Sequence, residues 1–279
     1  MHASIFPEDS LNYALQKLAS DYLPDALPLV HTTTLERLKN IINEKSLILS
    51  QCEIFNQDLL YFFYGGPFYR PKAPEFENSI SSLPVSLMLK PSILKEATCF
   101  YPYDTGAASN GFYGEDWSSV LGAFEKFKMN GDESFLAPKK FIRYIYGDNQ
   151  SYFDGELIET YKDLPHPIPT VCDFYTDMKK MWVTSRTPDI RRSKIECHFD
   201  KPIPLANNVL WIAVPSLNQK KYIEYKTALK CDLPSTVGVD KPKFYWYPWN
   251  GDLDGEGIVK QLEAQAIEYL RDLDYLPKP

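Results

Sequence analysis

A short apolar segment, a capped helix and an aromatic segment follow one another closely near the start of this chain. Residues 27–31 are apolar up to the final His31 and predict a strand. Thr33 and Glu36 then stand at capping-box spacing, which predicts the start of a helix. That helix would bury one apolar stripe, made of Leu35, Leu38, Ile41 and Ile42. A second strand, Leu59–Tyr64, ends at Gly65-Gly66-Pro67, and the strand–helix–strand order indicates an α+β fold.

Further elements are predicted on both sides of this core. Periodicity predicts helices over residues 10–22, 118–129 and 258–273, and strands over 85–90, 98–103, 195–199 and 209–214. The last two strands are expected to form a hairpin-like pair around Pro202-Ile203-Pro204. Residues 100–155 are acidic and aromatic, which suggests a substrate-facing insertion, although aromatics packed on a small domain explain them equally. We expect residues 1–279 to form a single domain that ends in the helix 258–273.

Composition excludes several classes of protein. The net charge of −7 argues against a large non-specific phosphate-binding surface, but it leaves room for a local basic groove. The five cysteines are odd in number and have no CxxC spacing, so they indicate neither a disulfide framework nor a zinc site. No apolar run is long enough to span a membrane, and the first residues begin no secretory signal. We therefore expect a cytoplasmic protein that binds no metal and no membrane.

Polar and aromatic side chains gather at neighbouring ends of the first two strands. They are one histidine, two threonines, two tyrosines and one arginine: His31, Thr32, Thr33, Tyr61, Tyr69 and Arg70. Imidazole and hydroxyl groups hydrogen-bond a ribose or a carboxamide, tyrosine rings stack on flat rings, and arginine pairs with phosphate. This set suits a dinucleotide better than a metal ion. The alternative is that His31 is an ordinary strand-end histidine and that the tyrosines belong to the core.

The spaced set resembles the NAD-binding core of ADP-ribosyltransferases of the diphtheria-toxin and PARP type, whose signature positions are His, Tyr and Glu. In that family a strand ends in His-x-Thr or His-x-Ser, which His31-Thr32-Thr33 matches. A later strand carries Tyr-Phe, a break and another tyrosine, similar to Tyr61-Phe62 and Tyr69. The turn 66–69 is similar to the Ser-Pro-Met-x-Tyr turn of bacterial toxins that ADP-ribosylate nucleic acid. The third signature is a glutamate that opens a later strand, and Glu196 is the best match.

The resemblance implies a split, bent mixed β-sheet with flanking helices and a central NAD cleft. It further implies that His31, Thr32 and Thr33 hold NAD, that Tyr61 or Tyr69 stacks on nicotinamide, and that Arg70 contacts phosphate. Glu196 would stabilise the positive charge that develops on the ribose when the nicotinamide bond breaks. Its neighbour Cys197 is not expected to pair with His198, because adjacent strand residues face opposite sides.

A basic loop precedes Glu196 and offers a contact for the acceptor. It contains Arg186, Arg191 and Arg192, with Lys194 at its end, and it is either a solvated face or an edge that grips phosphate. Lys194 stands two positions before Glu196, where some branches of the family carry an acidic residue or glutamine that selects a protein acceptor. Its presence there favours a nucleic-acid base.

The predicted function is an NAD-dependent ADP-ribosyltransferase that modifies DNA or RNA in a toxin or phage-defence role, with a cognate antitoxin protein as a possible partner. Two alternatives remain open. One is a non-catalytic module that binds NAD, ADP-ribose or nucleic acid, and the other is an NAD glycohydrolase with water as the acceptor.

Overall fold

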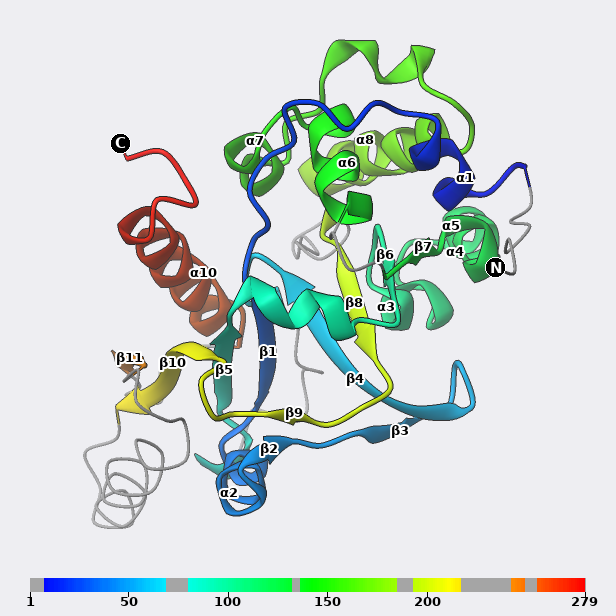
Figure 1. Ribbon diagram of the computed structural model, residues 1–279. Coiled ribbons are helices and arrows are strands. Elements are labelled where there is room, and N and C mark those ends of the chain that lie inside the picture. The colour runs from blue at the N-terminus through cyan, green and yellow to red at the C-terminus, as the bar shows by residue number, and fades with distance from the viewer. Residues whose placement is uncertain are drawn as a thin grey trace, which may run out of the picture.

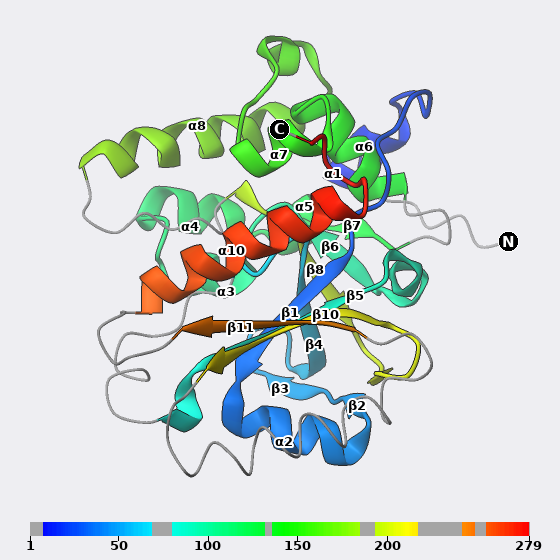
Figure 2. The same cartoon turned by 90° about the vertical axis from the view of Figure 1, so that its left-hand side faces the viewer.

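The computed structural model describes residues 8–68, 80–131, 136–184, 193–216, 242–248 and 255–278. A mixed β-sheet crosses the molecule, with α1, α6, α7 and α8 gathered beyond one end of it and α2 beyond the other (Figure 1). The view in Figure 2 shows α10 running across the flank of the sheet, where it contacts β5 and β11. No helix of the described residues is long and apolar enough to cross a membrane.

The strands are short, and most lie in one sheet. They are β1 (Leu29–Thr34), β2 (Ser46–Leu47), β3 (Ser50–Cys52), β4 (Gln57–Tyr64), β5 (Pro84–Leu89), β6 (Cys99–Tyr101), β7 (Met129–Asn130), β8 (Glu196–Phe199), β9 (Ile203–Pro204), β10 (Val209–Ser216) and β11 (Lys243–Pro248). The helices are α1 (Leu11–Gln16), α2 (Leu35–Glu44), α3 (Thr105–Ser109), α4 (Glu115–Leu121), α5 (Phe124–Phe127), α6 (Leu136–Ile145), α7 (Asn149–Asp154), α8 (Ile168–Thr184) and α10 (Gly255–Asp272). Short 3₁₀ turns cover Ile80–Ser82, Pro91–Glu96 and Glu159–Asp163.

The main sheet divides between its two central strands. Its order is β11-β10-β5-β1-β4-β8-β6-β7, with β3 paired to β4. Strands β10 and β11 are parallel, whereas the other pairs are antiparallel. Strand β1 pairs with β5 along its whole length but with β4 only at Leu29↔Tyr64 and Val30↔Phe63. Beyond these two pairs β1 and β4 separate, so the predicted split, mixed sheet with flanking helices is confirmed.

Helix α2 forms as its apolar stripe predicts, with a cap one residue later than expected. Leu35, Leu38, Ile41 and Ile42 are all buried. The hydroxyl of Thr34 accepts a hydrogen bond from the amide of Arg37 at 3.4 Å, which makes Thr34 the N-cap. The prediction of a capping box at Thr33 is therefore wrong, because β1 continues through Thr33 and buries its side chain (6% exposed).

Two other predictions are corrected by the strand pairing and helix bounds. Residues 118–129 form two helices rather than one, because α4 ends at Leu121 and Gly122, a poor helix former, separates it from α5. Strands β8 and β10 do not form a hairpin. Strand β8 pairs with β4 and β6, whereas β10 pairs with β5 and β11, on the other side of the split. Pro202 and Pro204 lie between them and donate no amide to a hairpin ladder.

The C-terminal helix agrees with its predicted amphipathic pattern. Helix α10 spans Gly255–Asp272 and buries Ile258, Leu262, Ala266 and Leu270. Residues 100–155 form β6, β7 and the helices α3 to α7 within the described ranges. That this region faces a substrate, and that the chain is a single domain, stay predictions.

Candidate active site

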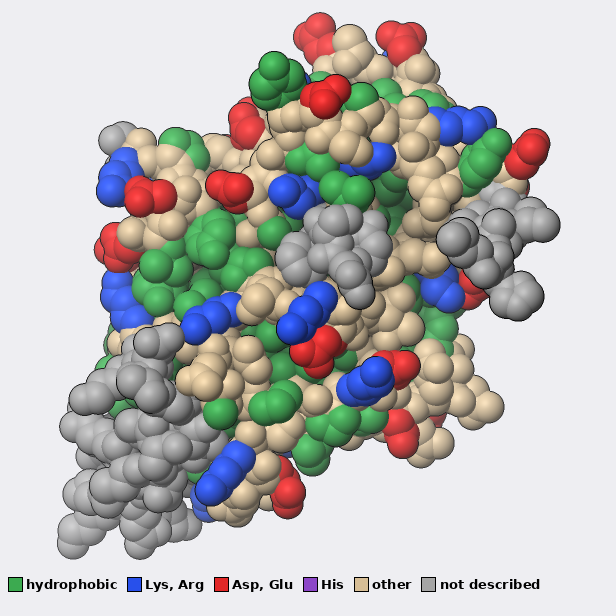
Figure 3. All heavy atoms as spheres, in the orientation of Figure 1, with side chains coloured by type: hydrophobic (Ala, Val, Ile, Leu, Met, Phe, Trp, Pro, Cys, Tyr) green, Lys and Arg blue, Asp and Glu red, His purple; other side chains and the backbone are tan. Residues whose placement is uncertain are grey.

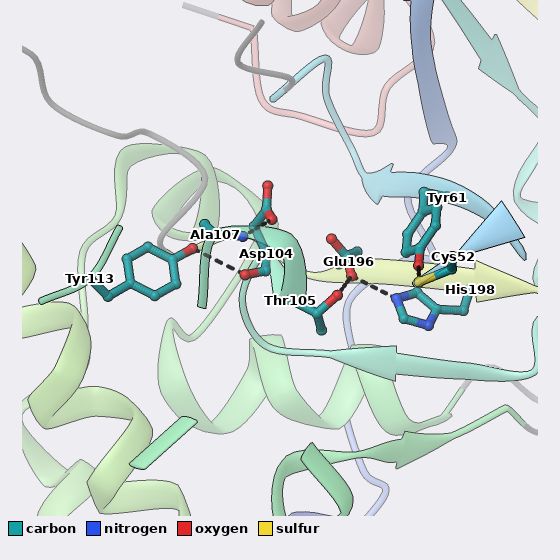
Figure 4. A network of polar contacts seen from close by, with 8 residues as sticks. All are labelled: Cys52, Tyr61, Asp104, Thr105, Ala107, Tyr113, Glu196 and His198. Atoms are coloured by element: carbon teal, nitrogen blue, oxygen red, sulfur yellow. Dashed lines mark hydrogen bonds and ion pairs between the residues drawn. The ribbon is translucent and has the colours of Figure 1, made fainter. Parts of the chain in front are cut away.

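Glu196 lies at the first position of β8, between two strands. It is opposite Phe63 of β4 on one side and Tyr101 of β6 on the other. Its side chain is buried (4% exposed), and Oε1 accepts two short hydrogen bonds (Figure 4). Thr105 Oγ1 donates one at 2.6 Å, and His198 Nε2 lies at the same distance. A carboxylate buried in this way needs both partners, because an unpaired buried charge is strongly unfavourable.

His198 faces the same side of the sheet as Glu196 because the two residues are two positions apart in a strand. Its ring packs in an aromatic setting, with centroid distances of 4.6 Å to Tyr61, 5.0 Å to Tyr101 and 5.1 Å to Phe55. Burial acts to lower the pKa of His198, but hydrogen bonds to Cys99 and Glu196 and the charge of Glu196 outweigh it and raise the pKa to about 9. His198 is therefore a cation at neutral pH and forms an ion pair with Glu196.

The three residues at the predicted signature positions lie along one continuous path of contacts. His31 Nδ1 is 2.8 Å from the backbone oxygen of Tyr61. The ring of Tyr61 then contacts that of His198, which is bonded to Glu196. His31 reaches across the place where β1 and β4 separate, so its imidazole joins the two halves of the sheet. Tyr61 connects His31 to the carboxylate region through its backbone on one side and its ring on the other.

The protonation of His31 follows from its contacts. A carbonyl oxygen only accepts hydrogen bonds, so Nδ1 of His31 carries a proton and donates it to Tyr61. Burial lowers the pKa of His31, and the charge of Arg37 adds to this effect, against the hydrogen bond to Tyr61. The imidazole is therefore neutral at neutral pH, and its Nε2 is an acceptor suited to a hydroxyl such as that of a ribose.

Of the two threonines in the same strand, one is hydrogen-bonded inside the protein and the other is buried. The Thr32 hydroxyl is hydrogen-bonded to the Ser86 hydroxyl on β5 at 2.9 Å. Thr33 is 6% exposed. Alternation along β1 places His31 and Thr33 on one side of the sheet and Thr32 on the other. A role for either threonine in holding NAD stays a prediction.

Several of the predicted site residues lie outside the described residues: Tyr69, Arg70, Arg186, Arg191 and Arg192. Lys194 is described, and its expected place on a phosphate-gripping surface is wrong. Its side chain is 3% exposed, and Nζ donates to the backbone oxygens of Tyr152 and Phe153 at 2.9 and 3.0 Å. These oxygens belong to the last turn of α7, where helix carbonyls lack partners and a cation is favourable.

A tyrosine network fixes the residues just before Glu196. The Tyr152 hydroxyl donates to the backbone oxygen of Tyr64 at 3.1 Å and accepts from the amide of Ile195 at 3.0 Å. The amide of Tyr64 donates in turn to the Ile195 oxygen at 2.9 Å. The hydroxyl of Tyr146 donates to the Ser193 oxygen at 3.0 Å. Together with the Lys194 contacts, these bonds hold the backbone at residues 193–195 and thereby set the position of Glu196.

Sequence reasoning missed His198 and Thr105. The signal for His198 was present, because a histidine two positions after a glutamate in a strand faces the same side. Thr105 is 91 residues from Glu196 in sequence, and no local pattern links the two. The expectation that Cys197 and His198 face opposite sides is confirmed. Cys197 is fully buried opposite Phe62, whereas the ring of His198 packs on Tyr61.

The charges around the molecule are mixed. On the face drawn in Figure 3, the Lys and Arg side chains of the described residues are scattered among acidic ones and do not gather into one basic surface. Within the described ranges, no group of three or more His, Cys, Asp or Glu side chains is placed to hold a metal ion.

Comparison with known proteins gives little beyond this geometry. No protein-family model matches the sequence, and no curated protein matches it. One solved structure that is similar is "Thermus sp. 2.9 DarT in complex with NAD+". The likeness covers 82% of this chain and 98% of that chain, with 13% sequence identity and a TM-score of 0.41.

Proposed function

We propose that the chain is an NAD-dependent ADP-ribosyltransferase whose acceptor is DNA or RNA, acting in a toxin or phage-defence role. The observation that supports this best is the path of contacts from His31 through Tyr61 and His198 to Glu196. It brings together the three residue types that the family uses, at the place where the sheet splits. NAD is the co-substrate in this proposal.

The chemistry needs one fixed carboxylate beside the ribose. When the bond between nicotinamide and the ribose breaks, its electron pair leaves with neutral nicotinamide, and positive charge develops on the sugar. The lone pair of the acceptor then forms the new bond to the same carbon, and the acceptor gives up a proton to solvent. Glu196 is suited to stabilise the intermediate charge because its position is set in advance by Thr105 and His198.

Tyr61 is suited to contact the nicotinamide ring. Burial, a hydrogen bond to Cys52 and the charge of Glu196 hold the pKa of Tyr61 well above its usual range, so the phenol stays neutral. Its hydroxyl is fixed by Cys52 Sγ at 2.7 Å, and its ring is half-buried beside His198. A neutral ring held in place in this way provides a flat stacking surface at low cost in side-chain entropy.

A nucleic-acid acceptor is supported by the residues that precede Glu196. The position two residues upstream holds Lys194, whose ammonium is fully used inside the protein, rather than an acidic group that would select a protein side chain. The arginines Arg186, Arg191 and Arg192 precede it in sequence, in a protein whose net charge is −7. A local group of arginines in an acidic chain is suited to phosphate contacts.

Replacing Arg191 and Arg192 together with Ala is expected to reduce transfer to nucleic acid and to weaken its dependence on salt. Each phosphate that a protein neutralises releases condensed counterions, so losing two contacts reduces the slope of log affinity against log salt by about 2. Titrations of labelled nucleic acid at several salt concentrations measure this slope. An unchanged slope and unchanged transfer would mean that these arginines form a solvated surface, and would favour a protein acceptor. An equal loss of nicotinamide release without nucleic acid would assign the loop to the NAD site.

His31→Ala is expected to weaken NAD binding by more than it lowers stability. His31 lies within β1, where this strand separates from β4, and its imidazole makes a polar contact with Tyr61 and offers Nε2 to the ligand, whereas it fills little of the core. Thermal melts with and without NAD measure both effects, because a ligand that binds only the folded state raises the melting temperature. His166→Ala, at an exposed histidine, is the matched control. A lower melting temperature with an unchanged shift by NAD would make His31 a structural residue only.

One observation favours the second candidate, a non-catalytic NAD- or ADP-ribose-binding module. Glu196 is 4% exposed and already paired with a cation, as in a purely structural ion pair. Incubation of the purified protein with NAD labelled in the adenine and in the nicotinamide separates the two functions. Release of nicotinamide with transfer of the adenine label to DNA or RNA supports the transferase, and release with free ADP-ribose alone indicates a glycohydrolase. NAD binding without release indicates the binding module.

A further inference from the structure

We propose that His198 is a positioning residue that controls Glu196 in two ways. It holds the carboxylate by one oxygen, and as a cation it cancels the charge of that carboxylate until it gives up its own proton. Glu196 and His198 thus form one unit in the proposed site. The consequence for turnover rests on the proposed function, whereas the coupling between the two side chains does not.

The geometry fixes which oxygen of Glu196 is available. Both hydrogen bonds converge on Oε1, one from Thr105 on α3 and one from His198 on β8 (Figure 4). Because the donors come from two different elements, the carboxylate cannot rotate without breaking one of the bonds. No hydrogen bond to Oε2 from the described residues is found. Oε2 is therefore the oxygen that would face a ribose.

The charge of Glu196 has one direct counter-ion among the described residues. The titratable groups that surround the pair from the neighbouring elements are Cys52, Tyr61, Cys99, Tyr101, Tyr103, Asp104 and Glu125. The tyrosines are neutral because burial raises the pKa of each. The Asp104 carboxylate accepts a hydrogen bond from the amide of Ala107 at the start of α3. None of these groups is a cation, so the direct counter-ion of Glu196 among them and their described neighbours is His198, which touches it.

The pairing has a consequence for catalysis. A carboxylate paired with an imidazolium is a dipole, and it stabilises a nearby positive charge much less than a free carboxylate does. When His198 loses its proton, it can still donate its remaining N–H to Glu196, which then carries an uncompensated negative charge. Turnover is therefore expected to rise with pH through the titration of His198.

Histidine NMR tests the pair itself, whether or not the protein turns over NAD. The full-length protein is labelled with ¹⁵N in its four histidines, and the imidazole signals are followed with pH. The His198 signal, assigned by its loss in His198→Gln, is expected to titrate near pH 9 in the wild type. Glu196→Gln removes the charge of Glu196 but keeps burial and the contact with Cys99, so His198 is expected to titrate at a clearly lower pH than in the wild type, while His31 is unchanged. The same His198 titration in both proteins would overturn the proposal.

The pH profile of nicotinamide release tests the consequence. Between pH 7 and 9 the deprotonated fraction of a group with a pKa of about 9 grows about 50-fold, and kcat of the wild type is expected to follow it with little change in KM. His198→Gln keeps a neutral donor and is expected to give a flat profile. A flat wild-type profile would overturn the catalytic part of the proposal even if His198→Gln fails to fold. If no nicotinamide is released at any pH while NMR shows the coupled titration, the proposed function fails and the pair stands.

Discussion

Nicotinamide release by the Glu196→Gln variant is expected to be roughly 100-fold or more slower than that of the wild type, at the pH of greatest turnover. The amide keeps the shape of the carboxylate, and its oxygen still accepts from Thr105 and His198. What it lacks is the negative charge that stabilises the developing charge on the ribose. NAD affinity is expected to change little, because the substrate in its ground state carries that charge on the nicotinamide ring and not on the sugar. Single-turnover measurements at saturating NAD, with binding followed separately, resolve the two effects.

The control for this substitution is Glu159→Gln, which removes the same charge from an exposed position in the 3₁₀ turn Glu159–Asp163. It is expected to behave like the wild type. Far-UV circular dichroism and thermal melts establish that Glu196→Gln is folded before its rate is compared. Near-wild-type release by folded Glu196→Gln would exclude Glu196 from the catalytic role. If the chain is a toxin, the same change is expected to relieve its toxicity to host cells.

The local part of the fold was predictable because its signals are periodic. The stripe Leu35, Leu38, Ile41 and Ile42 predicts α2, and the aromatic segment that ends at Gly65 predicts β4. Alternation around Glu196 predicts β8. Hydrophobic periodicity reports which side of an element is buried, and burial in turn fixes the element.

The pairing between distant strands was harder to predict from the sequence. The two strands that follow residue 193 look like a hairpin in sequence, yet β8 and β10 belong to different halves of the split sheet. Nothing local distinguishes a strand that pairs with its neighbour from one that crosses to another part of the sheet, apart from the prolines between them. The split was expected only from the family resemblance, and not from the periodicity of the residues.

In the candidate site, too, some residues were predictable from the sequence and others were not. His31, Tyr61 and Glu196 are recognisable residue types in predicted strands, and the structure joins them by contacts. Thr105 and Lys194 were not predictable in their roles, because each depends on a partner far away in sequence. Lys194 illustrates the physical reason. A lysine in a basic segment is usually solvated, but this one is held inside by the carbonyls at the end of α7 and by the ring of Phe68, 4.7 Å from Nζ.

Removing a single oxygen atom from Tyr152 is expected to destabilise the protein by about 3 kcal/mol. Its hydroxyl is fully buried and serves two backbone groups, the oxygen of Tyr64 and the amide of Ile195. Tyr152→Phe keeps the ring and its packing but leaves both groups short of a partner. Each unsatisfied buried group costs about 1–3 kcal/mol. The melting temperature is expected to fall by roughly 6–12 °C.

Tyr22→Phe is the matched control, because it makes the same chemical change at a side chain that is 91% exposed. Its melting temperature is expected to equal that of the wild type. Thermal and urea unfolding of the three proteins measure the difference. If Tyr152→Phe has the same melting temperature as Tyr22→Phe, the hydroxyl of Tyr152 does not hold β4 and the start of β8 together. If it is destabilised as expected, the residue before Glu196 has lost a backbone anchor, and the position of the carboxylate depends on a side chain 44 residues earlier in the chain.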